Sequence, residues 1–103
     1  MTRTGIETED QIQEQTTKPK MFVVFVHNDP VTPRGFVVEV LTRYFQKNAE
    51  QATQIMMTAH TQGMGAVGVY TLEIAETRSS IANQYAREQG FPLHFSVQEE
   101  DQK

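Results

Sequence analysis

The chain has 103 residues, a length typical of one domain, with 38% hydrophobic and 21% charged residues. Its net charge of −4 argues against nucleic acid as a partner, because a basic face supplies most of the affinity for phosphates. Cysteine is absent, which excludes disulfides, thiolate zinc sites and cysteine nucleophiles. No apolar run approaches the roughly 20 residues of a membrane helix, so we expect a cytoplasmic protein without a membrane partner.

The sequence divides into two tails and one folded unit. Residues 1–20 are rich in Thr, Gln and Glu and carry few large apolar side chains, so they are predicted to form a flexible tail. Residues 99–103 are predicted to form a short acidic tail. The patterns of a folded domain fill residues 21–98.

The first predicted element is a buried strand over residues 21–26, which are aromatic and β-branched. Asn28, Asp29 and Pro30 end it with turn chemistry. Thr32 is then a candidate N-cap for a helix with proline in its first turn. The apolar stripe of this helix consists of Phe36, Val37, Val40, Leu41, Tyr44 and Phe45.

A second helix follows directly. Asn48 and Gln51 have the spacing of a capping box, and Gly63 is a typical helix stop. One face of this predicted helix carries Ala49, Ala52, Met56, Ala59 and His60.

Two short strands, over residues 67–70 and 93–97, flank a third predicted helix. Thr71 can cap this helix, and Gly90 follows its last turn. Its predicted buried face consists of Ile74, Ile81, Ala82 and Tyr85. The order strand, helix, helix, strand, helix, strand indicates an α+β fold.

Two patterns are weak as ligand sites. Residues 63–68 spell G-x-G-x-x-G, but a dinucleotide site needs a strand before the glycines and a helix after them, and here the order is reversed. His27, His60 and His94 belong to different elements and lack the spacing of familiar zinc motifs, so no metal is expected. No catalytic pair stands out, and no cofactor is expected.

One group of residues has the chemistry of a binding site. The loop after the first strand is rich in hydrogen-bond acceptors, and His60 lies one helical turn after Met56. Acceptors from the loop and His60 would then border a hollow lined by Met56, Ala59, Val37 and Leu93. Turn chemistry and ordinary core packing also account for these residues, and periodicity alone favours that interpretation.

The chain resembles the ClpS adaptors of the bacterial N-end rule pathway. The resemblance extends from about residue 21 to residue 98 and is carried by the segments 28–29, 32–33, 36–41, 52–60, 62–63, 68–70, 73–77, 85–87 and 92–93. It implies a three-stranded antiparallel sheet packed against three helices. It also implies a protein that is not an enzyme, but an adaptor for substrates that begin with Leu, Phe, Tyr or Trp.

The resemblance implies a role for particular residues. Asn28, Asp29 and His60 match the positions that hold the substrate's α-ammonium group. The side chain of the first residue would enter a pocket walled by Val37, Met56, Ala59 and Leu93. The implied mouth of this pocket consists of Pro30, Val31, Thr32 and Arg34.

Three of these residues depart from the family pattern. Pro30 stands where the family has a second acidic residue, and Arg34 replaces a bulky apolar residue at the mouth. Ala59 replaces a common Val, which should enlarge the pocket slightly. We expect an altered specificity or affinity.

The implied partner is the N-terminal domain of a Hsp100 unfoldase such as ClpA or ClpC. Glu73 and Arg78 match a docking surface, and residues 1–20 match a tail that engages the unfoldase. One alternative is a divergent docking modulator that no longer binds free N-termini. A third hypothesis is a small enzyme with His60 and Asp29 as an acid–base pair.

Overall fold

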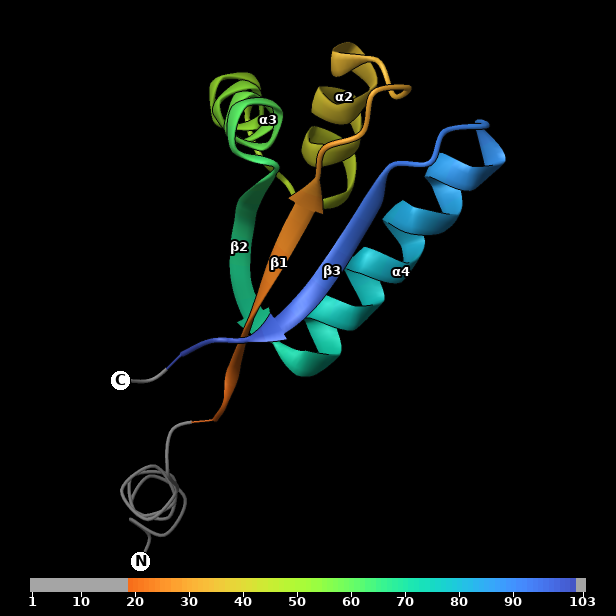
Figure 1. The fold of residues 1–103 in the computed structure, drawn as a ribbon. Helices are drawn as coiled ribbons and strands as arrows, with labels where there is room; N and C mark the ends of the chain where they lie inside the picture. The colour runs from red at the N-terminus through yellow and green to blue at the C-terminus, as the bar shows by residue number, and fades with distance from the viewer. Residues whose placement is uncertain (1–18, 102–103) are drawn as a thin grey trace, which may run out of the picture.

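The computed structural model describes residues 19–101. Nearly all of the predicted N-terminal tail and the last two residues of the acidic tail lie outside this range. The elements, labelled in Figure 1, are β1 (Met21–His27), α2 (Arg34–Tyr44), α3 (Ala49–Gln62), β2 (Met64–Thr71), α4 (Leu72–Glu88) and β3 (His94–Glu99).

The three strands form one antiparallel sheet in the order β2-β1-β3. Helix α4 runs along one face of this sheet, whereas α2 and α3 lie together at the end where β1 finishes (Figure 1). The predicted α+β fold with three strands and three helices is therefore confirmed. This arrangement leaves the loop from β1 to α2 beside the C-terminal half of α3.

The core lies between the sheet and the helices. Alternate residues of β1 face it, so Val24 and Val26 are 0% and 1% exposed. The rings of Phe45 and Phe95 stack with their centroids 5.0 Å apart, which joins the end of α2 to β3. Burial of each such aromatic ring contributes about 1.5–3 kcal/mol to the free energy of unfolding.

Helix α4 packs through small side chains, which differs from the prediction. Its buried residues are Ala75, Ser79, Ala82 and Ala86. The prediction that Ile74 and Ile81 are buried is wrong, because they are 43% and 47% exposed. Small side chains allow the helix axis to approach the sheet closely, and the adjacent, bulkier stripe then faces outward.

The helix ends agree only in part with the predicted caps. The Asn48 capping box of α3 is confirmed: Asn48 Oδ1 accepts from the backbone N–H of Gln51 at 2.7 Å, and Gln51 Oε1 accepts from that of Asn48 at 3.1 Å. The predicted side-chain cap at Thr32 is wrong, because α2 has Pro33 at its N-cap. Thr71 occupies the N-cap of α4 without a side-chain hydrogen bond.

Two glycines of the G-x-G-x-x-G pattern have structural roles. Gly63 ends α3 with a φ of 97°, and its N–H donates to Ala59 O at 2.9 Å. At Gly65, a Cβ atom would lie 2.8 Å from Ile55 O and 3.2 Å from Ala59 N. The absence of a side chain at Gly65 therefore lets β2 lie directly against the backbone of α3.

We expect Gly65→Ala to lower the free energy of unfolding by about 1–3 kcal/mol, since α3 must move away from β2 to accommodate the methyl group. Gly35→Ala is the matched control: a Cβ atom there meets nothing within 4 Å, and alanine favours the helix by up to about 1 kcal/mol. Urea unfolding of both variants measures the difference. Equal stability of the two variants would contradict the close contact.

Candidate functional site

A cavity of about 370 Å³ opens between the end of β1, helices α2 and α3, and the segment before β3. This volume lies within the roughly 300–1,000 Å³ range of small-molecule sites. Its lining residues are Val26, His27, Asn28, Asp29, Pro30, Thr32, Arg34, Val37, Met56, Ala59, His60 and Leu93.

The inner wall of the cavity is apolar. Val37 and Met56 are each 8% exposed, and Ala59 and Leu93 are each 4% exposed. They come from α2, from α3 and from the residue that precedes β3. A cavity with such walls favours an apolar side chain, because water inside it lacks hydrogen-bond partners.

The rim is built by the loop between β1 and α2. Asp29 Oδ1 accepts from the backbone N–H groups of Val31 and Thr32 at 2.8 and 2.7 Å, and its Oδ2 accepts from Thr32 Oγ1 at 2.7 Å. The backbone N–H of Asn28 donates to Gly63 O at 3.0 Å, which ties the loop to the end of α3. The loop is therefore held at both ends, and most of the acceptor capacity of the Asp29 carboxylate is used within it.

The Asn28 side chain is available for a ligand. It is exposed, and over residues 19–101 its amide forms no hydrogen bond. An amide oxygen on a rim of fixed backbone is a suitable acceptor for a cationic group.

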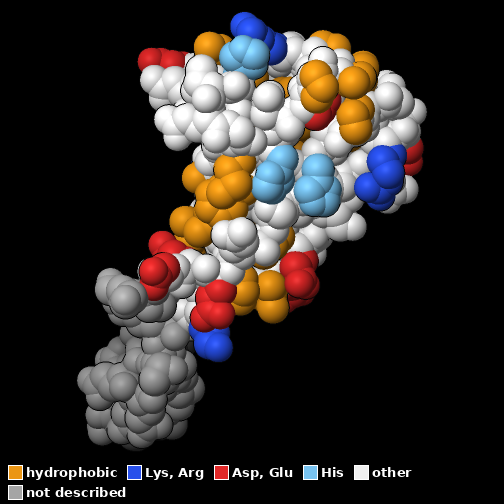
Figure 2. All heavy atoms as spheres, viewed as in Figure 1, with side chains coloured by type: hydrophobic (Ala, Val, Ile, Leu, Met, Phe, Trp, Pro, Cys, Tyr) orange, Lys and Arg blue, Asp and Glu red, His pale blue; other side chains and the backbone are white. Residues whose placement is uncertain are grey.

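Arg34 and His60 meet across the opening. The guanidinium Nη2 of Arg34 lies 2.8 Å from Nε2 of His60, and both residues are exposed. Figure 2 shows a basic side chain against a histidine at the end of the molecule that carries α2 and α3. Arginine only donates, so Nε2 of His60 is the acceptor in this pair.

The predicted site residues mostly come together. All the predicted ammonium, pocket and mouth residues line the cavity except Val31, which is 61% exposed. The sequence analysis missed Val26, although its burial follows from the alternation along β1. His27, which was not predicted as a site residue, also lines the cavity, and its Nε2 is hydrogen bonded to Ser96 Oγ at 2.7 Å.

The acid–base pair of the enzyme hypothesis is not assembled in this structure. No hydrogen bond joins Asp29 to His60 in the described part of the chain, because the carboxylate is bonded to its own loop and the imidazole to Arg34. The rings of His27 and His94 lie 5.7 Å apart on neighbouring strands, whereas Nε2 of His60 is hydrogen bonded to Arg34. Within residues 19–101, no three candidate ligand side chains are placed to hold a metal ion.

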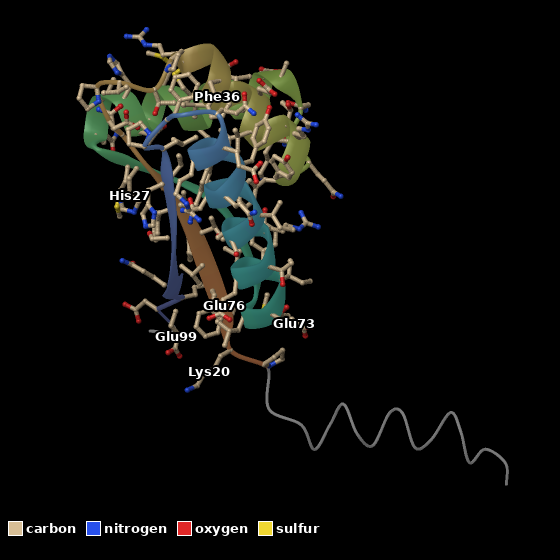
Figure 3. All side chains as sticks on the ribbon, turned by 90° about the vertical axis from the view of Figure 1, so that its right-hand side faces the viewer. Lys20, His27, Phe36, Glu73, Glu76 and Glu99 are labelled. Atoms are coloured by element: carbon tan, nitrogen blue, oxygen red, sulfur yellow. The ribbon has the colours of Figure 1, made fainter. Side chains whose placement is uncertain are left out.

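The predicted docking residues lie at the other end of the molecule. Figure 3 shows Glu73 with Glu76 at the start of α4, at the end of the molecule that also carries Lys20 and Glu99, whereas Phe36 of α2 lies at the opposite end. Among the residues described, no helix is long and apolar enough to cross a membrane.

Arg78 follows Glu73 by about one and a half turns of α4. It lies over the ring of Tyr70, with its guanidinium carbon 5.4 Å from the ring centroid. The pKa of Tyr70 is raised because burial disfavours the phenolate, and the nearby charge of Arg78 opposes this shift. The same helix carries three exposed apolar side chains, namely Leu72, Ile74 and Ile81. An apolar centre beside fixed charges is typical of a protein–protein interface.

Comparison with known proteins places the chain in a family. The model of the family "ATP-dependent Clp protease adaptor protein ClpS" matches residues 17–96. The adapter protein ClpS of Lawsonia intracellularis is 47% identical over 91 residues, which cover 88% of this chain and 84% of the relative. That of Shewanella denitrificans is 48% identical over 86 residues, or 84% of each chain.

A solved structure agrees with the sequence matches. The structure of Agrobacterium tumefaciens ClpS2 bound to L-phenylalaninamide has a TM-score of 0.78 and 40% identity. The match covers 81% of this chain and 100% of that chain. The chain therefore belongs to the ClpS family of ATP-dependent Clp protease adaptors.

Proposed function

We propose that this adaptor captures proteins by a free N-terminal residue with a large apolar side chain, namely Leu, Phe, Tyr or Trp, and delivers them to a Clp unfoldase. The observation that carries the proposal is the cavity, whose apolar wall is bordered by hydrogen-bond acceptors from Asn28 and His60. The ligand of the Agrobacterium protein, L-phenylalaninamide, combines an α-amino group with an aromatic side chain. The cavity is suited to both parts of such a molecule.

The energetics favour a free terminus. An α-amino group has a pKa of about 7.7–8.0, so at neutral pH it is mostly an ammonium with three donors and no acceptor. Hydrogen bonds to a charged group contribute about 1.5–3 kcal/mol each, and burial of a Leu or Phe side chain adds about 1.5–3 kcal/mol. Their sum supports binding in the micromolar range, about −8 kcal/mol.

Each rim residue has a distinct part. The Asn28 amide oxygen and the His60 imidazole accept hydrogen bonds from the ammonium. Asp29 fixes the loop and adds a negative charge beside the terminus. Val37, Met56, Ala59 and Leu93 contact the first side chain.

We expect short labelled peptides that begin with Leu, Phe, Tyr or Trp to bind, and the same peptides with an acetylated N-terminus to lose binding at least about tenfold, since an amide cannot supply the donors. His60→Ala should weaken binding of the free peptides by a similar factor. Fluorescence anisotropy measures both, with an Ala-initiated peptide as control. Binding that ignores the first residue and its amine would refute the N-terminal recognition.

Two substitutions of Asp29 separate its charge from its loop bonds. We expect Asp29→Asn to weaken peptide binding about threefold, because Asn keeps an acceptor for the N–H groups of Val31 and Thr32 but loses the charge. Asp29→Ala should weaken it about tenfold or more, since the loop loses these bonds as well. The same anisotropy titration checks this order. Equal losses in the two variants would show that the loop bonds matter little for binding.

We propose that the partner of this adaptor is the N-terminal domain of an unfoldase of the ClpA or ClpC type, which docks on Glu73 and Arg78. Two features support it: both residues belong to the N-terminal half of α4, where Glu73 is exposed and Arg78 half-buried, and the same helix carries the exposed side chains of Leu72, Ile74 and Ile81. The separation of this surface from the cavity allows substrate and unfoldase to bind together (Figure 3). The cytoplasmic location expected from the sequence stays a prediction.

Reversal of charge at Glu73 tests the docking surface. We expect Glu73→Lys to lower the affinity for the unfoldase domain about tenfold or more, because reversal of the charge turns an attraction across the interface into a repulsion. Peptide binding should stay unchanged. Glu88→Lys is the matched control on the same helix, 15 residues further along and therefore about 22 Å away. Pull-down and calorimetry with the ClpA or ClpC domain measure the affinity of each variant. If Glu88→Lys weakened docking as much as Glu73→Lys, the surface would be assigned wrongly.

A second candidate function is a docking modulator that does not bind free N-termini. It is favoured by two features of the rim: Pro30 offers no side-chain acceptor, and Arg34 occupies the acceptor of His60. The peptide experiment above distinguishes the two, because the modulator would bind the unfoldase domain but no N-terminal residue.

A further inference from the structure

Arg34 competes with a ligand for one hydrogen-bond acceptor. Its guanidinium Nη2 lies 2.8 Å from Nε2 of His60, and the two residues come from α2 and α3. Because arginine has no acceptor and no accessible neutral form, Nε2 must carry the lone pair. His60 is then neutral, with its proton on Nδ1.

A neutral imidazole has a single accepting nitrogen. The ammonium of a ligand that hydrogen bonds to His60 needs the same lone pair that Arg34 uses, and the two cations also repel each other. Arg34 must therefore leave His60 before the ammonium can bind there.

Within residues 19–101, the displaced guanidinium has no carboxylate partner. Over residues 19–101, Arg34 forms no ion pair. The acidic residue among those that line the cavity is Asp29, whose carboxylate already accepts three hydrogen bonds from Val31 and Thr32. A carboxylate from outside is the natural partner of this exposed guanidinium.

We propose that Arg34 makes the site selective for N-termini followed by an acidic residue. The inference rests on the proposed function, since it concerns the residue behind the one in the cavity. Consecutive α-carbons are about 3.8 Å apart, so the second residue stays close to the cavity, whose lining includes the exposed Arg34. An Asp or Glu there draws the guanidinium away from His60 and pairs with it, whereas a Lys or Arg repels it.

A simpler role for the pair is to tie α2 to α3. Both side chains are exposed, so the bond contributes little to stability, and the stability of the fold already rests on buried side chains such as Leu41 and Phe45. A structural tie predicts that loss of Arg34 leaves peptide preference unchanged. Peptide preference therefore separates the two roles.

The first test compares three peptides with a free N-terminal Leu and Glu, Gln or Lys at the second position. We expect the wild type to bind them in the order Glu, Gln, Lys, over a range of about tenfold. Arg34→Met should bind the Gln peptide about threefold to tenfold more tightly and lose the order, because nothing then competes for His60. Arg34→Gln should keep a donor to His60 but lose the charge preference.

Arg43→Met is the matched control, since it removes the same charge from the same helix. Arg43 pairs with Glu39, away from the cavity, so this variant should bind like the wild type. The proposal is overturned if Arg34→Met retains the order of the peptides, or if it binds the Gln peptide no more tightly than the wild type does. It is also overturned if Arg43→Met reproduces the effect, which would make it one of net charge.

The second test needs no peptide. In mildly alkaline buffer, long-range ¹H–¹⁵N correlation spectra report which nitrogen of His60 carries the proton. We expect the Nδ1–H form in the wild type and a shift toward the Nε2–H form in Arg34→Met. An Nε2–H form in the wild type overturns the proposal. A different result would overturn the proposed function itself: neither the wild type nor any variant distinguishes free from acetylated peptides, although His60 is in the Nδ1–H form. The proposed peptide selectivity would then fail as well.

Discussion

The close packing of α3 on β2 determines where the site can form. At Gly65, the strand lies so near the helix backbone that even a methyl group would contact Ile55 O at 2.8 Å. The capping box at Asn48 and the stop at Gly63 then fix the length of α3 at both ends. With its bounds and its distance from the sheet set, the helix presents Met56, Ala59 and His60 beside the end of β1. The apolar wall and one acceptor of the rim thus follow from backbone packing.

The loop opposite this helix depends on a different constraint. A chain that turns after a strand and enters a helix leaves several backbone N–H groups without partners. Asp29 accepts from two of them, at Val31 and Thr32, and the N–H of Asn28 donates across to Gly63 O. The side chains of the rim therefore sit on a backbone whose hydrogen bonds are already formed. A ligand that binds there orders little additional chain, which lowers the entropic cost of binding.

The sequence predicted the order of the elements because the local signals were strong and independent. The capping box at Asn48, the helix stop at Gly63 and the change between the periods of a strand and a helix agreed with one another. The outward position of Ile74 and Ile81 was not predictable in the same way, because two neighbouring stripes of α4 are both apolar and periodicity alone favours the bulkier one. Only the distance between α4 and the sheet selects the alanine stripe. Those isoleucines then become available for a partner surface beside Glu73.

The cavity residues were foreseen by resemblance to a family, and the Arg34–His60 pair was not foreseen. Sequence spacing says nothing about two exposed side chains 26 residues apart, whose contact depends on how α2 and α3 lie against each other. The family pattern implies an acidic side chain at Pro30 and an apolar one at Arg34, so this rim has one negative charge fewer and one positive charge more. Both changes weaken the attraction of the rim for an ammonium. An adaptor of this kind would need compensation from its substrates, and an acidic residue just behind the N-terminus restores the lost negative charge at the same place. Under the proposed selectivity, the second residue of the ligand supplies the carboxylate that the family pattern places at position 30.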